Sequence, residues 1–269
     1  MPHCSWAALV LCTMLSGCAS PTGGNSLHEP PVSPPAPPPP PGPARGNPPP
    51  VGAGARVLFI GNSLTQGNDL PGMVRDLAAA AGLDWEVEAQ LRGGAGLQDQ
   101  WVSGARERIA SGRWDVVVLQ QGPSSLEESR VDLRHWTGEF DPLIRAAGGR
   151  SALYMVWPDR TRLSWFDRVR DSYALAARDV SGYSLPAGET WRAAWRVTPT
   201  LPLYGGDDFH PTVAGSYAAA LTIFAALGGK SPLGLPAPAS LDAGTVERLQ
   251  QAALEALDDY ADYAPDDVP

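Results

Sequence analysis

The fold of this chain follows from the stretch Val57-Leu58-Phe59-Ile60-Gly61-Asn62-Ser63-Leu64-Thr65. Its first four residues are aliphatic or aromatic, and such a run bounded by glycine is typical of a buried strand. Residues 71–81, which follow, have helical composition. We therefore expect Ser63 on a strand-to-helix turn, where N–H groups at the start of a helix point towards its hydroxyl. This turn suits a serine nucleophile, but it equally suits an ordinary helix cap, because Ser and Asn are favoured N-cap residues.

Strands and helices alternate along the rest of the chain, which predicts a parallel sheet. Further strands are expected at residues 85–91, 114–119, 152–157 and 183–185. Helices are expected at residues 97–111, 132–147, 163–180 and 211–227 and from residue 242, with a turn at 186–189. The loops after the first four strands should meet at the carboxyl edge of the sheet, where open α/β sheets build their sites. Those loops hold Ser63, Gly93 and Gly94, Gln121, and Trp157.

The amino-terminal residues resemble the export signal of bacterial lipoproteins. An apolar run at residues 6–15 is too short to span a bilayer, as in a signal peptide. Leu15-Ser16-Gly17-Cys18 matches a lipobox, which is cleaved before a cysteine that is then lipidated. Residues 1–17 are thus expected to be a signal peptide, although they contain no Lys or Arg, and Cys18 a lipid anchor at the cell envelope. A plain signal peptide cut elsewhere is the alternative.

Residues 18–54 are expected to form a disordered tether before a domain at residues 55–269. Proline dominates residues 30–50, and such sequence stays extended as polyproline II. A docking site for a proline-recognising module is the alternative. The cysteines of the chain, Cys4, Cys12 and Cys18, all precede the domain, which can therefore hold no disulfide and no thiol metal site.

A serine nucleophile needs a base, and the domain has two histidines, His135 and His210. Asp207 lies on the same turn as His210, so its carboxylate can accept the Nδ1 proton and leave Nε2 facing Ser63. His135 lies on an expected helix with no carboxylate placed to orient it, and we interpret it as a surface or packing residue. Taken alone, Asp207 and His210 would equally fit a helix-capping turn beside a satisfied histidine.

Together these motifs resemble those of the SGNH (GDSL) hydrolase superfamily. Gly61-Asn62-Ser63-Leu64-Thr65 corresponds to its Gly-Asp-Ser-Leu block, and Asp207-Asp208-Phe209-His210-Pro211 matches its Asp-x-x-His-Pro block. The resemblance covers residues 56–227 and implies that Ser63, His210 and Asp207 are nucleophile, base and orienting acid. It also implies an oxyanion hole formed by the N–H groups of Ser63 and of a glycine, Gly94 by preference, with Gly93 as the alternative.

The third block departs from the family pattern. Members usually have Gly-x-Asn-Asp after the central strand, with the Asn side chain completing the oxyanion hole, and this chain has Leu119-Gln120-Gln121-Gly122. By position Gln121 replaces the Asn, and its amide can donate the same hydrogen bond. Its extra methylene requires a shifted backbone or another rotamer. If Gln121 is misplaced, Gln120 takes the role or activity is low.

Substrate-binding candidates are aromatic and basic. Trp157 and Trp191 could stack on a sugar or pack an acyl group, and Arg92, Arg160 and Arg162 could receive an anionic group. The alternative is that these residues are core aromatics and solvated charges. The sequence suggests no metal site and no cofactor, because the domain histidines are far apart. A formal net charge of −9 argues against nucleic acid as a partner and against broad adhesion to anionic lipid.

The resemblance and the chain pattern together predict a flavodoxin-like three-layer α/β/α domain with a parallel sheet of about five strands. We expect it to be an exported, lipid-anchored serine esterase, a monomer that acts on a small ester or an acylated carbohydrate, with acetyl as the expected acyl group. The alternatives are a lysophospholipase or thioesterase, acyl transfer to an acceptor other than water, and a non-catalytic lipoprotein that binds glycan.

Overall fold

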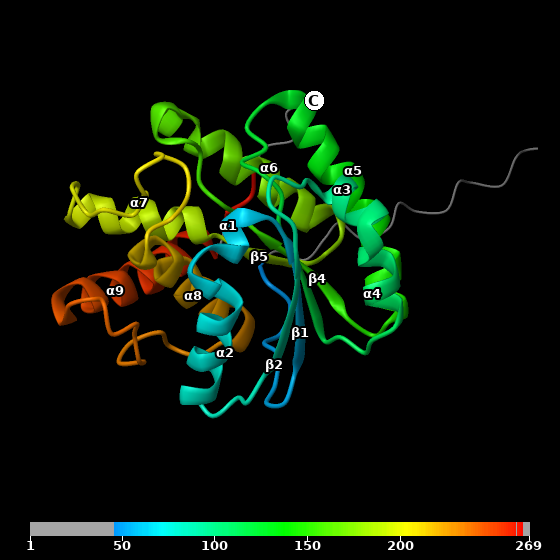
Figure 1. The fold of residues 1–269 in the computed structure, drawn as a ribbon, viewed down its shortest axis with the longest axis horizontal. Coiled ribbons are helices and arrows are strands. Elements are labelled where there is room, and N and C mark those ends of the chain that lie inside the picture. Colours follow the sequence, from blue (N-terminus) through cyan, green and yellow to red (C-terminus); the bar gives the residue numbers. More distant parts are fainter. Residues whose placement is uncertain (1–45, 262, 266–269) are drawn as a thin grey trace, which may run out of the picture. The chain divides into compact units, whose positions relative to one another are not determined.

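The computed structural model describes residues 46–261 and 263–265 of the chain. The expected signal peptide, the lipidation site at Cys18 and the amino-terminal part of the tether lie outside these residues. The described part contains a parallel sheet with the strand order β2-β1-β3-β4-β5 (Figure 1). Its strands are β1 (Arg56–Gly61), β2 (Glu86–Leu91), β3 (Val116–Leu119), β4 (Arg150–Tyr154) and β5 (Tyr183–Leu185). This is the flavodoxin-like order, so the predicted fold class is confirmed.

Helices cover both faces of the sheet (Figure 1). On one face α2 and α8 pack side by side, and α7 and α9 pack against α8, while on the other face α5 lies between α4 and α6. In chain order the helical segments are α1 (Ser63–Gln66), η1 (Gly67–Asp69), α2 (Leu70–Ala80), α3 (Leu97–Gln100), η2 (Trp101–Ala105), α4 (Arg106–Ala110), α5 (Glu127–Ala146), η3 (Arg160–Trp165), α6 (Phe166–Asp179), α7 (Ala187–Val197), α8 (Val213–Gly228) and α9 (Ala243–Tyr260).

The hydrophobic core lies on both sides of the central strands. The aliphatic and aromatic side chains of β1 and β3 are fully buried, as expected for continuous apolar runs in a parallel sheet. α8 is buried around most of its circumference, because α2, α7 and α9 surround it. Neither α8 nor any other helix in the described part combines the length and the apolar character that crossing a bilayer requires.

The structure corrects the turn expected at residues 186–189. Pro186 is the N-cap of α7, and the residues after it form the first turn of that helix. Proline is compatible with a helix start because the first N–H groups of a helix have no partner within it. Gly188 allows the first turn of α7 to pack closely against the segment after β4, since a Cβ on this residue would lie 2.5 Å from the carbonyl oxygen of Val156. α5 also begins earlier than expected, at Glu127.

Residues 46–54 lie against the domain, so the tether expected at residues 18–54 is too long at its carboxyl end. The Asn47 side chain exchanges two hydrogen bonds with the backbone of Ser184 on the edge strand β5, at 2.7 and 3.1 Å. The carbonyl groups of Pro49 and Gly52 accept from the side chains of Tyr183 and Trp85. Prolines lack an N–H but keep the carbonyl, so a proline-rich segment can still bind the domain through its acceptors.

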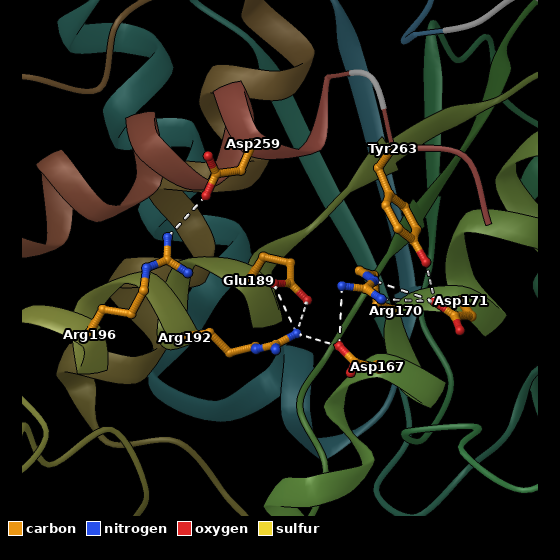
Figure 2. A network of polar contacts seen from close by, with 8 residues as sticks. All are labelled: Asp167, Arg170, Asp171, Glu189, Arg192, Arg196, Asp259 and Tyr263. Carbon is orange, nitrogen blue, oxygen red and sulfur yellow. Dashed lines mark hydrogen bonds and ion pairs between the residues drawn. The ribbon is translucent and has the colours of Figure 1, made fainter.

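Figure 2 shows a network of charged side chains that ties α6 to α7. Arg192 on α7 lies 2.8 Å from Asp167 on α6 and 3.1 Å from Glu189 on its own helix. Arg170 lies 3.2 Å from Asp167 and over the ring of Tyr263. The Glu189 side chain is only 13% exposed, and burial raises its pKa above the ordinary value, although Arg192 and Arg170 oppose that shift. The network therefore depends on Arg192 to neutralise an enclosed carboxylate.

Replacing Arg192 with Met should lower the free energy of unfolding by about 1–3 kcal/mol near neutral pH, because the Glu189 carboxylate loses its nearest cation. Burial raises the pKa of Glu189, so falling pH protonates its carboxylate and removes the unpaired charge. The free energy of unfolding that the variant loses should therefore become smaller as the pH falls. Unfolding in urea should therefore show a smaller difference in the free energy of unfolding between wild type and Arg192→Met at about pH 5 than at about pH 8.

Arg75→Met is the matched control. It removes an ion pair with Asp76 in which the side chains are 52% and 68% exposed, and it should cost less than about 0.5 kcal/mol. If the two variants lost the same free energy of unfolding, the claim that Arg192 neutralises an enclosed carboxylate would be contradicted.

Candidate active site

Ser63, His210 and Asp207 form a hydrogen-bonded series at the carboxyl edge of the sheet. Oγ of Ser63 lies 2.9 Å from Nε2 of His210, and Nδ1 of His210 lies 2.5 Å from Oδ2 of Asp207. When Nδ1 carries the proton, the imidazole donates to the carboxylate and Nε2 can accept from the serine. Ser63 is the first residue of α1, directly after β1 and the capping residue Asn62. The structure thus brings together the three residues that the two sequence motifs supply.

Asp207 closes its own loop as well as contacting His210. Its Oδ1 accepts the backbone N–H groups of Phe209 and His210, at 3.1 and 2.9 Å. The hydrogen bond from the imidazole and these two backbone donors lower the pKa of Asp207 to about 2. Asp208 adopts a left-handed conformation, with φ of 58°, which Asp tolerates better than most residues. The Gly205 N–H closes the loop by donating to the His210 carbonyl at 2.7 Å.

The turn that holds Ser63 is braced on both sides. Asn62 caps α1 by accepting a backbone N–H of its first turn, at 3.0 Å. Gln120, at the end of β3, accepts through Oε1 from the Asn62 N–H and the Thr65 hydroxyl, at 2.9 and 2.7 Å. Gln120 can approach this closely because residue 61 is glycine, since a Cβ on Gly61 would lie 2.6 Å from Oε1. The position of the serine is therefore set by hydrogen bonds within its turn and to the end of the adjacent strand β3.

The glycine-rich loop before α3 is fixed beside this turn. Asn62 donates through Nδ2 to the carbonyl of Ala95 at 3.0 Å, and Oε1 of Gln121 accepts the first N–H of α3 at 3.1 Å. Gly94 in this loop has φ of 72°, a conformation that glycine adopts without strain. The backbone N–H groups of Gly94 and Ser63 have no hydrogen-bond partner within residues 46–261 and 263–265. Both are therefore available as donors.

Both glutamines considered as oxyanion donors use their amides within the protein. Nε2 of Gln121 donates to Ser124 at 3.3 Å and to Asp132 at 3.1 Å, and its side chain is buried. Nε2 of Gln120 donates to the carbonyl of Gln121, while its Oε1 braces the turn of Ser63. The geometry therefore does not support the predicted role of Gln121. The physical reason is its extra methylene, which lets the amide reach Asp132 on α5.

Trp157 and Trp191 are core aromatics, which is the second of the two interpretations that the sequence left open. Both are fully buried, and their rings stack with centroids 3.7 Å apart and planes 12° apart. Trp157 continues the buried run after β4, and Trp191 lies on the inward face of α7. Trp157 still supports the site, because its indole N–H donates to the carbonyl of Phe209 at 3.0 Å.

The remaining candidates lie at the surface. Arg92 is exposed and donates to the Ser103 hydroxyl at 2.7 Å. His135 is exposed on α5, with its ring against Trp136, which confirms its interpretation as a surface residue. Arg160 lies 3.4 Å from Asp208 on the loop of His210. Across the described ranges, no group of three or more His, Cys, Asp or Glu side chains is arranged to hold a metal ion.

A pocket of 310 Å³ opens beside the loop of His210. It is lined by apolar Pro123, Pro158 and Phe209 and by polar Ser125, Asp159, Thr161 and Arg162. The Phe209 and His210 rings meet edge to face, with centroids 5.3 Å apart. Except for Arg162, sequence analysis did not single out these residues. The available signal was Pro158-Asp159, which ends the buried run after β4 at the carboxyl edge.

No protein-family model and no curated protein sequence matches the chain. Solved structures do match. A protein from Slackia heliotrinireducens, assigned as an SGNH hydrolase, has a TM-score of 0.56 and 28% identity over 65% of this chain and 100% of its own. A DUF4886 family protein from Bacteroides uniformis has a TM-score of 0.67 and 20% identity over 78% of this chain and 97% of its own. An acetylxylan esterase from Geobacillus stearothermophilus has a TM-score of 0.52 and 20% identity over 66% of this chain and 96% of its own.

The structures at 20% identity establish the shared fold, and the one at 28% identity adds a likeness of sequence along the whole of that protein. The chain carries the first and last sequence blocks of the SGNH hydrolases, and the structure brings the residues of these blocks into hydrogen-bonding contact. In its fold and in these two sequence blocks the chain is similar to the SGNH hydrolases.

Proposed function

We propose that this SGNH-type serine ester hydrolase removes short acyl groups, acetyl above all, from carbohydrate. The observation that carries the proposal is the alignment of Ser63, His210 and Asp207, with 2.9 and 2.5 Å between the bonded atoms. In the proposed reaction His210 accepts the hydroxyl proton as Ser63 attacks the ester carbonyl. The alcohol leaves with that proton, and water then hydrolyses the acyl-enzyme by the same route.

The N–H groups of Ser63 and Gly94 are the proposed donors to the oxyanion. Fixed donors of this kind stabilise the charge that develops on the carbonyl oxygen in the transition state. Gln121 is proposed to act indirectly, because its Oε1 holds the start of α3 and so the loop that carries Gly94. Asn62 holds the same loop through Ala95. The proposed oxyanion hole thus consists of backbone donors on two braced loops.

The character of the pocket favours the ester of a sugar over the ester of a long-chain lipid. At 310 Å³ it lies at the small end of ligand pockets, which span roughly 300–1,000 Å³. Polar Ser125, Asp159 and Arg162 form part of its lining, which does not suit a long apolar chain. An acetylxylan esterase has this fold. A lysophospholipase or thioesterase is the rival, and it would turn over long-chain esters faster than acetyl esters.

A non-catalytic glycan-binding protein is the second candidate, and one observation favours it. The amides of Gln120 and Gln121 are both engaged, so neither completes an oxyanion hole. The alignment of Ser63 with His210 favours the enzyme, because a binding protein has no need of a base beside a serine.

We also propose that the enzyme works as a monomer at the cell envelope, anchored through lipid on Cys18. The lipobox sequence Leu15-Ser16-Gly17-Cys18 supports this anchor, and the proline-rich segment after it supports a spacer. The formal net charge of −9 weighs against adhesion to anionic lipid and against nucleic acid as a partner.

Replacing Ser63 with Ala should lower the turnover of p-nitrophenyl acetate by about a thousandfold or more, because the nucleophile is lost. The midpoint of thermal unfolding should not fall. His135→Ala is the control, and it should keep wild-type turnover because the exposed ring lies against Trp136. Near-full activity in a pure Ser63→Ala protein would refute the proposal. Wild-type turnover should fall as the acyl chain of the ester lengthens, and a rise would favour the lipid-ester rival.

Replacing Gln121 with Leu should lower kcat by no more than about tenfold, since the amide only positions a loop, whereas loss of a direct oxyanion donor costs about 100- to 1,000-fold. Steady-state kinetics with p-nitrophenyl acetate measure this. Ser124→Ala removes one acceptor of the same amide and serves as the milder comparison. A loss in the larger range would mean that Gln121 turns to the oxyanion during the reaction.

Asp207 should stabilise its loop throughout the neutral and mildly acidic range, because its pKa is lowered to about 2. A carboxyl whose pKa falls on folding adds stability above its unfolded value, about 3.9, and loses it as the pH falls through the folded value. The difference in thermal midpoint between the wild type and Asp207→Asn should therefore be constant above about pH 4 and narrow towards about pH 2. A difference that already narrows between about pH 7 and pH 5 would contradict this account.

A further inference from the structure

We infer that the pocket beside the loop of His210 binds the sugar ring on the alcohol side of the scissile ester. This inference rests on the proposed function and names the part of the substrate that the pocket recognises. The pocket is the one lined by Pro123, Ser125, Pro158, Asp159, Thr161, Arg162 and Phe209.

The pocket is built onto the loop that carries the base. The Arg160 N–H donates to the carbonyl of Asp208, and the Trp157 indole donates to the carbonyl of Phe209, both at 3.0 Å. The Tyr204 hydroxyl also donates to the carbonyl of Pro158. These bonds join the segment after β4 to the loop that holds His210, so the pocket and the imidazole keep a fixed relation.

The position of the pocket assigns it to the alcohol. In ester hydrolysis by a serine and a histidine, the departing alcohol takes its proton from the imidazole. The leaving group must therefore lie next to His210. Phe209 both lines the pocket and contacts the His210 ring, so the alcohol side of the ester meets this cavity.

Three polar side chains of the pocket have hydrogen-bonding capacity to spare. Oδ1 of Asp159 accepts from Thr161, but its Oδ2 has no donor within the described part of the chain. Hydrogen bonds from Thr161 lower the pKa of Asp159, which therefore remains a carboxylate. The Arg162 guanidinium lies over the ring of Trp165 at 4.9 Å and meets no acceptor among the described residues. The Ser125 hydroxyl, on a residue only 8% exposed, is likewise without a partner there.

This set of groups matches a sugar better than an anion or a lipid. A sugar hydroxyl both donates and accepts, so a carboxylate acceptor and a guanidinium donor together suit neighbouring hydroxyls. The charges of Asp159 and Arg162 oppose one another, which leaves little net attraction for an anionic group. Pro123, Pro158 and Phe209 offer apolar surface to the C–H face of the ring. The volume of 310 Å³ suits a ligand at the small end of the usual range.

The test compares two acetyl esters that differ in the alcohol. Monoacetylated methyl xyloside and methyl glucoside present a sugar to the pocket, whereas p-nitrophenyl acetate presents an aromatic alcohol without hydroxyls. Arg162→Gln and Asp159→Asn should each lower the ratio of kcat/KM for an acetyl sugar to that for p-nitrophenyl acetate by about tenfold or more, because a hydrogen bond to a charged group is lost. The change should lie mainly in KM for the sugar ester.

Arg168→Gln is the matched control, because Arg168 also lies over Trp165, at 5.1 Å, but does not line the pocket. It should leave the ratio unchanged. The inference would be overturned if Arg162→Gln and Asp159→Asn left the ratio of the two kcat/KM values unchanged. It would also be overturned if the Arg168→Gln control lowered this ratio by as much as they do.

A binding measurement separates failure of this inference from failure of the proposed function. The methyl glycosides, without acetyl, are titrated into the Ser63→Ala protein and followed by ligand-observed NMR. Binding that is lost in Ser63→Ala/Arg162→Gln would support the sugar pocket even if the wild type hydrolysed no ester. Hydrolysis of acetyl esters by the wild type, without binding of either glycoside, would overturn the pocket and leave the esterase standing.

Discussion

The hydrogen bond between Ser63 and Nε2 of His210 is the contact on which the rest of the site depends. It joins residues 147 positions apart in the sequence, and the fold brings them to a separation of 2.9 Å. β1 carries the serine to the carboxyl edge of the sheet, and the loop before α8 carries the histidine to the same edge. Because catalysis falls steeply with small errors in such distances, the elements behind both residues must be rigid.

The protein fixes the two partners by different means. On the side of the serine, polar side chains hold the turn, with Gln120 bridging β3 to Asn62 and Thr65. On the side of the histidine, an aromatic stack lies beneath the loop, and Trp157 donates from this stack to the carbonyl before His210. The first brace uses directional hydrogen bonds and the second combines one such bond with burial of large apolar surface.

Much of the fold and of the candidate site could be predicted from local sequence. The sequence did not settle the roles of side chains whose position depends on contacts with residues far away in the chain. Ser63 and His210 stand in short motifs next to a strand and a helix, so their meeting at one edge followed from the alternation of elements. Trp157 could either line a site or fill the core, and only its stacking on Trp191 decides between the two. Gln121 could either face the oxyanion or turn away, and Asp132 on α5 decides that. The pocket combines residues from three loops, and Pro158-Asp159 alone among them gives a signal in the sequence, which does not reveal the other two loops.

The central claim is that Ser63 is a nucleophile activated by His210. Its most direct test is covalent labelling of the pure protein with a fluorophosphonate, followed by peptide mass spectrometry. We predict a single adduct on Ser63, formed at least about a hundredfold more slowly in His210→Ala because the base is absent. An adduct on another serine, or no adduct on Ser63 in the wild-type protein, would contradict the account.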